Sequence, residues 1–500
     1  MMKLIFKPFD RNTPDLFPAC VQDYLPDDHM ARFVVEVIDQ LNIDDFTKTY
    51  RGVGSKAWHP AMMLSLLFYG YATGVFSSRK LEKATYDSVA FRYICANQHP
   101  DHDSINTFRK RFAPQISELF VQILLIAKES GWLNLGHVSL DGTKIKANAS
   151  KHKALSYQYA CELEAQLQEE VAELLKLAEQ AESSDLPEEF SIPEELKRRE
   201  DRLAVIADAK AEIERRAEER YQRERAEYEE KVARREVRNN AGKAPKEPEA
   251  GPREKDQTNL TDGESRIMPA SGGGFEQAYN AQASVDIDSG LIVTRHVTQA
   301  TNDKQEVEPT LAALEKLEPE LGKAEGLLAD AGYFSETNVN AVDDAGIRPY
   351  IAMERDAHNR RLQERFKPDA PMPEGDEVTP LLLMCWCLQT KAGRAIYSQR
   401  KSTIEPTFGI VKEVMGYRQF LVRGHKAVSA EWDLLCLAFN LKRMFSLKQE
   451  NDEKWLSILY FSLLEALYAA HIVRILAAML VSEYSLRAAH RSSDKHIAVI

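Results

Sequence analysis

Residues 137–148, HVSLDGTKIKAN, alternate apolar and polar side chains, which is typical of a β-strand. The preceding residues, 25–130, have the apolar runs and spacing of helices. We therefore predict that the first strand of a sheet begins near residue 137 and carries Asp141 at or near its end. A helical region comes before this strand and a long charged segment follows it.

Strand and helix patterns alternate again after about residue 257. FEQAYNAQASVD (275–286) and LIVTRHVT (291–298) are predicted to form a hairpin across the turn sequence IDSG. GLLADAGYF is predicted as a buried strand that ends at Asp330, and IRPYIAM as a further strand. Helices are expected at 305–316, at 336–345 and from about 391. This order predicts an α/β fold whose mixed sheet is flanked by helices.

A charged segment, residues 155–256, interrupts the strand pattern. Apolar residues recur every three or four positions along 155–182 and again along 194–238, as in two amphipathic helices. Prolines at 187 and 193 separate the two helices, and the proline-containing stretch APKEPEAGP ends the second. We interpret the segment as an inserted helical hairpin.

Composition leaves the choice of partner open. The chain has 500 residues with a net charge of −12, which argues against nucleic acid. However, residues 151–260 contain 28 acidic and 21 basic side chains, a net of −7, so over half of the excess lies in one segment. The six cysteines have no zinc-site spacing and are predicted to be reduced core thiols. The N-terminus lacks a signal-peptide pattern, so the cytoplasm is the expected compartment.

Three acidic residues have positions that suggest a shared site. Asp141 follows the first strand, Asp330 ends a later one, and Glu405 lies on a helix after the sheet. Such carboxylates repel one another unless a cation neutralises them, and hard oxygen ligands favour Mg²⁺ or Mn²⁺. Each residue also has an ordinary interpretation as a turn, cap or first-turn residue. The local motifs must decide between these interpretations.

From about residue 6 to residue 445 the chain resembles the DDE transposases of bacterial insertion sequences. The matching segments include HPAMMLSLLFYGYATGVFSSRKLE, DHDSINTFRKRF, VSLDGTKIKANASKHKALSY, SRIM, GGGFEQAYNAQASVD, GLLADAGYFSE and GRAIYSQRKSTIEPTFGIVKEVMGYRQFLVRG. The resemblance implies a ribonuclease-H-like core, an all-α N-terminal domain, and Mg²⁺ as cofactor, for which Mn²⁺ can substitute.

The resemblance also assigns residues. Asp141, Asp330 and Glu405 would be the catalytic, metal-binding acids. A Tyr-Arg-Glu-Lys signature falls on Tyr397, Arg400, Glu405 and Lys412. The signature places three residues between Arg and Glu, whereas Arg400 has four before Glu405 and Lys401 has three. Arg400 and Lys401 therefore compete for one DNA-phosphate contact. Tyr397 and Lys412 would be further phosphate-binding residues, Lys412 on the same helix face as Glu405.

The resemblance divides the chain into four parts. Residues 1–135 would be the N-terminal helical domain for DNA-end recognition or assembly, and residues 136–154 and 257–448 a split catalytic domain. Residues 155–256 form the inserted hairpin, with dimerisation or a structural role preferred over DNA contact. Residues 449–500 form a helical tail of unknown role.

The function implied by the resemblance is transposition. Double-stranded DNA would be cleaved at the terminal inverted repeats of an element, and the freed 3′ ends would be joined to target DNA. A homodimer in the active complex, nucleoid association and no membrane contact are expected. The main alternative is a catalytically inactive, domesticated DNA-binding protein. A coiled-coil scaffold and a general nuclease with the same fold are further alternatives.

Overall fold

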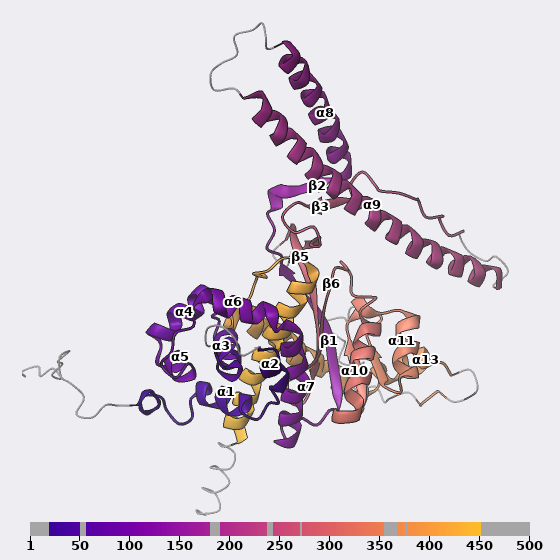
Figure 1. The fold of residues 1–500 in the computed structure, drawn as a ribbon. Coiled ribbons are helices and arrows are strands. Elements are labelled where there is room, and N and C mark those ends of the chain that lie inside the picture. Colours follow the sequence, from indigo (N-terminus) through magenta and orange to yellow (C-terminus); the bar gives the residue numbers. More distant parts are fainter. Residues whose placement is uncertain are drawn as a thin grey trace, which may run out of the picture. The chain divides into compact units, whose positions relative to one another are not determined.

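The computed structural model describes residues 20–50, 57–180, 191–237, 244–270, 273–354, 369, 371–373, 375 and 378–451. The chain divides into two compact units, residues 1–441 and 442–500. Residues 442–451 of the second unit are helical, and the rest of the predicted tail lies outside the described residues. The first unit contains the sheet and all predicted site residues (Figure 1).

The N-terminal region is helical, as predicted. After a short 3₁₀ turn, η1 (Val21–Tyr24), it contains α1 (Met30–Ile38), α2 (Asp44–Lys48), α3 (Pro60–Ala72), α4 (Ser78–Asp87), α5 (Val89–Ile94), α6 (His102–Arg111) and α7 (Ala113–Glu129). α4 and α5 are divided at Ser88, whose backbone is extended. Asp101 caps α6 by accepting a 2.8 Å hydrogen bond from the Ser104 amide.

A buried polar contact joins these helices to the C-terminal part of the first unit. The hydroxyl of Tyr71 accepts a hydrogen bond from Arg109 (2.8 Å) and donates one to Glu431 (3.4 Å). Glu431 is buried and also accepts from the Leu421 amide at 2.8 Å. Arg109 of α6 therefore has a structural partner inside the protein.

A mixed six-stranded sheet forms the centre of the first unit. Its strands follow the order β4 (Arg266–Pro269), β5 (Phe275–Asp286), β1 (His137–Lys146), β7 (Gly326–Ala329), β8 (Arg348–Ile351), with β6 (Ile292–Thr298) also paired to β5. β1 is antiparallel to β5 and parallel to β7, and β7 is parallel to β8. The predicted α/β class is confirmed.

Asp141 lies within β1 and not at its end, because the strand continues to Lys146 against β5. The pairing of β1 with β7, however, covers only residues 137–139. The two parallel strands thus separate just before Asp141. This separation leaves room for side chains at the junction of the two strands.

Helices follow the strands in the predicted order. They are α10 (Val307–Leu321), α11 (Glu336–Asp344), α13 (Pro380–Gln389) and α14 (Lys391–Gly409), followed by a π-helical segment η4 (Ile410–Val414) and by helical residues 425–441. α13 was not predicted, and most of residues 357–380 lie outside the described part of the chain. The cysteines are free, but Cys20 is exposed, so it is not a core thiol. In the part of the chain that is described, no helix is both long and apolar enough to span a membrane.

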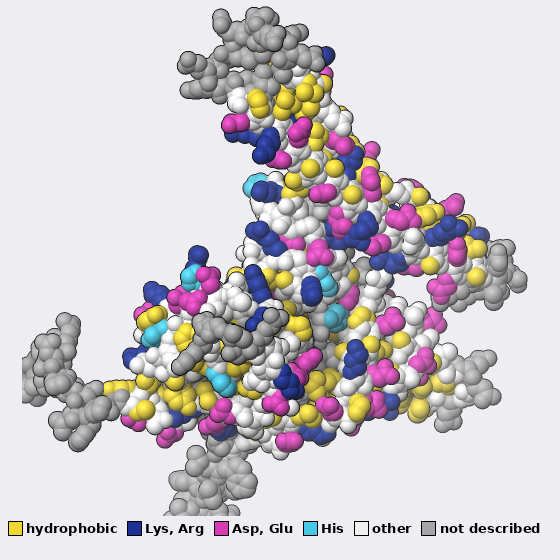
Figure 2. Space-filling view, viewed as in Figure 1, with side chains coloured by type: hydrophobic (Ala, Val, Ile, Leu, Met, Phe, Trp, Pro, Cys, Tyr) yellow, Lys and Arg dark blue, Asp and Glu magenta, His cyan; other side chains and the backbone are white. Residues whose placement is uncertain are grey.

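The inserted hairpin consists of α8 (Tyr157–Gln180) and α9 (Ile192–Val237), which lie side by side (Figure 1). Apolar residues of the two helices form one cluster with Leu155, which comes just before α8: Ala160, Leu163, Leu167, Leu203, Ile206 and Ala209. Acidic and basic side chains are interspersed over its surface (Figure 2). The hairpin connects to the sheet through a small antiparallel pair, β2 (Ala154–Ser156) and β3 (Gln257–Asn259).

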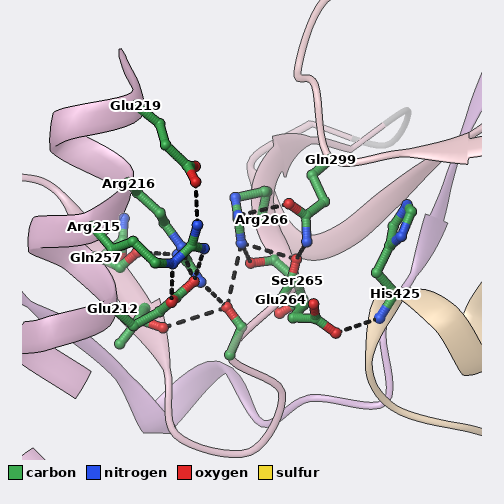
Figure 3. Close-up of polar contacts among 12 residues, drawn as sticks. Glu212, Arg215, Arg216, Glu219, Gln257, Glu264, Ser265, Arg266, Gln299 and His425 are labelled. Carbon is green, nitrogen blue, oxygen red and sulfur yellow. Dashed lines mark hydrogen bonds and ion pairs between the residues drawn. The ribbon is translucent and has the colours of Figure 1, made fainter. Parts of the chain in front are cut away.

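Two arginines fasten the base of the hairpin (Figure 3). Arg216 of α9 and Arg266 of β4 both donate to the carbonyl oxygen of Gly263. Arg266 also donates to Glu264 O at 2.9 Å and to Gln299 Oε1 at 2.8 Å. Burial, with the nearby charge of Arg216, lowers the pKa of Arg266 to about 10. The hairpin is thus attached to the sheet by side chains as well as by its two connecting strands.

Candidate active site

Asp141 is a mostly buried carboxylate at the point where β1 and β7 separate. Its side chain is 21% exposed, and its Oδ1 accepts a 2.8 Å hydrogen bond from the Gly142 amide. Burial and, to a lesser extent, the charge of Asp330 raise the pKa of Asp141 to about 6, while Arg400 opposes the shift. A carboxylate whose negative charge is only partly compensated is suited to meet a cation.

Asp330 comes directly after β7 and caps a short 3₁₀ turn, η3 (Ala331–Tyr333). Its Oδ1 accepts a 2.8 Å hydrogen bond from the Gly332 amide. Since β1 and β7 are parallel neighbours, Asp330 follows its strand at the edge toward which Asp141 lies. The influence of its charge on Asp141 agrees with this proximity. The structure therefore brings these two predicted site residues together.

Arg400 links the third predicted acid to the first. On α14, its Nη1 donates a 3.1 Å hydrogen bond to Asp141 Oδ2, and its Nη2 lies 3.7 Å from Glu405 Oε1. The Arg400 side chain is 11% exposed, whereas that of Glu405 is 55% exposed. Neighbouring acids, led by Asp141, raise the pKa of Arg400 against the effect of burial. Arg400 thus carries the positive charge that faces the acids.

The donor set is compatible with a divalent cation, but it is not assembled as a closed site. Asp141 and Asp330 provide hard oxygen ligands of the kind that Mg²⁺ and Mn²⁺ prefer. Among the described residues, no group of three His, Cys, Asp or Glu side chains is positioned to hold a metal. The reason is visible in the contacts: Glu405 reaches the other acids through Arg400 and not directly.

The remaining predicted phosphate contacts differ in their surroundings. The Tyr397 hydroxyl donates to the Ala329 carbonyl at 3.4 Å, next to Asp330. Lys401 is exposed and makes no hydrogen bond or ion pair with any described residue. Lys412 donates to Lys144 O at 3.3 Å, and burial lowers the pKa of Lys412.

Lys412 also departs from the spacing argument made from the sequence. It lies in the π-helical segment η4, which begins at Ile410, after Glu405. A π-helical turn contains more residues than an α-helical turn, so seven positions do not correspond here to two regular turns. Glu405 and Lys412 therefore do not lie on one uniform α-helix, as the spacing argument assumed.

The sequence analysis missed a polar cluster beside the acids. Oδ1 of Asp303 accepts hydrogen bonds from Asn280 (2.7 Å), Gln282 (2.8 Å) and Lys144 (3.1 Å). Asn280 and Gln282 are completely buried, like Ser284, the next residue on the same side of β5. Polar residues at alternating positions in an otherwise apolar strand were the signal that could have revealed this cluster.

Comparison with known families gave two matches. A model described as "Transposase domain (DUF772)" matches residues 19–111, and one described as "Transposase DDE domain" matches residues 384–445. The second range includes Arg400, Glu405 and Lys412. Neither curated proteins nor solved structures gave a significant match.

The α/β fold with its mixed sheet and N-terminal helices is consistent with the ribonuclease-H-like fold of these enzymes, and both family matches indicate a transposase. More specifically, the two matches support a DDE transposase of insertion-sequence type. The resemblance noted from the sequence motifs is thereby confirmed.

Proposed function

We propose that the protein cleaves double-stranded DNA at the ends of its element and joins the freed 3′ ends to target DNA, with Mg²⁺ as cofactor. The observation that carries this proposal is the placement of Asp141 and Asp330 on neighbouring parallel strands, with Arg400 in contact with Asp141 and Glu405. This constellation lies on the fold of a chain that matches two transposase domains.

Asp141, Asp330 and Glu405 are the residues that would hold the metal. A bound divalent cation supplies charge neutralisation to phosphoryl transfer. The exposed Glu405 side chain is free to turn toward the two other acids, while Arg400 exchanges its bond to Asp141 for a DNA phosphate. Tyr397 supports the end of β7 through Ala329, and Lys412 offers a second cation beside Lys144.

We also propose the assembly in which this chemistry takes place. Two DNA ends must be held together for joining, so two copies of the chain would act on a pair of terminal inverted repeats. The charged hairpin serves as a strut or as a dimer contact. The domain boundaries and the cytoplasmic, nucleoid-associated location predicted above belong to the same proposal.

A second candidate is a catalytically inactive protein that only binds DNA. The observation that favours it is the contact of Arg400 with Asp141, together with the lack of a three-residue metal group among the described residues. The presence of all three acids favours catalysis. A cleavage assay separates the two candidates.

The test uses a supercoiled plasmid that carries the gene with its native flanking DNA. Purified wild-type protein is incubated with the plasmid in Mg²⁺ and in EDTA, and the Asp330→Asn variant is incubated in Mg²⁺. DNA breaks and newly joined junctions are then mapped to the nucleotide. We expect metal-dependent breaks at two inverted repeats, followed by joining of 3′ ends, both lost in the variant. Binding without breaks in Mg²⁺ or Mn²⁺ would support the inactive protein, and breaks without joining a nuclease.

A further inference from the structure

We propose that Asp303 is a positioning residue that sets the spacing between Asp141 and Asp330 through Gln282 and Tyr333. Asp303 lies between β6 and α10, outside every motif used to recognise the family. The inference rests on the proposed function, because it concerns the same pair of acids. Three separate contacts carry it.

The first contact lies against β1. Side chains alternate between the faces of a strand, so Asp141 and Gly142 lie on opposite faces. Gly142 pairs with Gln282 of β5. A Cβ at position 142 would lie 2.2 Å from Gln282 Nε2 and 2.9 Å from Asp303 Oδ1. The polar cluster therefore packs directly on the backbone next to Asp141, and only glycine leaves room for it.

The second contact reaches the turn that begins at Asp330. The amide of Gln282 has a fixed orientation, because its Nε2 donates to Asp303 at 2.8 Å while its Oε1 accepts from the Tyr333 hydroxyl at 2.5 Å. Tyr333 is completely buried and ends the 3₁₀ turn that Asp330 caps. Asp303, together with Asn280 Oδ1, which accepts from the same Nε2 at 3.1 Å, thus determines which end of the Gln282 amide faces the Tyr333 hydroxyl.

The third contact places Asp303 beside the same turn. A Cβ at Gly332 would lie 2.9 Å from Asp330 Oδ1 and 3.8 Å from Asp303 Oδ2, so both carboxylates border this glycine. Oδ1 of Asp303 already accepts three hydrogen bonds, one of them from the cation of Lys144. An oxygen occupied in this way acts as an anchor for its donors. Asp303 therefore acts on the acids through its neighbours.

The experiment compares four variants. Asp303→Ala removes the anchor, whereas Asp303→Asn removes the charge but keeps an oxygen that can accept from Asn280 and Gln282. Tyr333→Phe removes only the link to the Asp330 turn. Tyr279→Phe is the matched control, because Tyr279 is an equally buried tyrosine of β5 whose hydroxyl donates to Asp262 at 2.9 Å.

Two readouts are taken on the full chain: Mn²⁺ binding by calorimetry, and amide hydrogen exchange of residues 330–334 in EDTA. Loss of an outer residue that orients metal ligands typically weakens metal binding by about 10–100-fold. We expect this weakening for Asp303→Ala, with a smaller one for Tyr333→Phe and near-normal binding for Asp303→Asn. Amide exchange in the turn should accelerate only in Asp303→Ala and Tyr333→Phe. Tyr279→Phe should match the wild type in both readouts.

Normal Mn²⁺ binding and normal exchange in Asp303→Ala would overturn the proposal. An Asp303→Asn variant as impaired as Asp303→Ala would also overturn it, because the charge and not the accepting oxygen would then matter. If Asp303→Ala does not fold, Tyr333→Phe decides through its exchange rates. If wild type and Asp141→Asn bind Mn²⁺ equally, the proposed metal site is wrong, while exchange in EDTA still tests the role of Asp303.

Discussion

Arg400 donates a 3.1 Å hydrogen bond to Asp141 across a separation of 259 residues in the chain. The contact joins α14 to the first strand of the sheet and places a guanidinium group beside the two neighbouring acids. Because the same side chain lies 3.7 Å from Glu405, it occupies the centre of the proposed site. Binding of a metal and DNA would require this contact to change.

The first prediction concerns the competition between Arg400 and Lys401. Arg400→Ala should slow cleavage by about 10²-fold or more, since it removes a cation aimed at developing charge. Lys401→Ala should stay within about twofold, because its side chain is exposed and has no partner among the described residues. Single-turnover cleavage of an end-containing duplex measures both rates. If Lys401→Ala lowered the cleavage rate more than Arg400→Ala, Lys401 and not Arg400 would be the phosphate contact.

The second prediction follows from the raised pKa of Asp141. Because this pKa in the folded protein, about 6, lies above the ordinary 3.8, ionisation of Asp141 disfavours folding. The cost is fully present above pH 6 and disappears as the pH falls toward 4. In EDTA at about pH 7.5, Asp141→Asn should therefore raise the melting temperature. The free energy of unfolding should increase by at most about 3 kcal/mol.

Thermal unfolding of both proteins across this pH range checks the sign. The gain should shrink as the pH falls from 6 to 4, and partial exposure of the side chain should keep it below the limit. A variant less stable than the wild type at neutral pH would mean that the bond to Arg400 outweighs the cost of burial.

The third prediction concerns the glycine after Asp141. Gly142→Ala should lower the free energy of unfolding by about 1–3 kcal/mol, because its Cβ would collide with Gln282 and Asp303. Gly136→Ala is the matched control, since the nearest atom to a Cβ there is Asn134 O at 3.9 Å. Denaturant unfolding measures both. Equal stability of the two variants would contradict the packing described for the polar cluster.

The fourth prediction concerns the base of the hairpin. Arg216→Ala should cost about 1–3 kcal/mol, because it removes a charged donor from the Gly263 carbonyl. Arg215→Ala should cost about 0.5 kcal/mol or less, because the ion pairs of Arg215 with described residues join it to Glu212 and Glu219 on its own helix and are largely exposed. The two variants are compared by their rate of proteolytic cleavage within residues 244–265 and by thermal unfolding. Similar behaviour of both variants would mean that Arg216 is not an anchor.

The fifth prediction separates binding from catalysis. Asp330→Asn and Glu405→Gln should each abolish cleavage while leaving affinity for end-containing DNA unchanged in EDTA. Each substitution removes one negative charge and keeps the shape of the side chain. Gel-shift and cleavage assays on the same duplex test this. Strand transfer that persists in either variant would remove that residue from the active site.

Local sequence patterns were sufficient to predict several secondary-structure elements and two of the site residues. Alternation in residues 137–148 predicted β1, and helical spacing in 155–238 predicted the hairpin, because these periodicities report which side of one segment is buried. Short motifs also singled out Asp141 within β1 and Asp330 after β7, and the parallel pairing of these two strands brings the residues together. Such signals lie within a few neighbouring residues and need no knowledge of the remaining chain.

Only the tertiary structure decided which side chains meet. Spacing left Arg400 and Lys401 as competitors, and the packing of α14 on β1 turned Arg400 to Asp141. Asp303 carried no motif, yet the register of β1 on β5 made it part of a buried cluster. These outcomes depend on strand register and helix packing between distant segments, and side-chain periodicity within one segment contains no information about either.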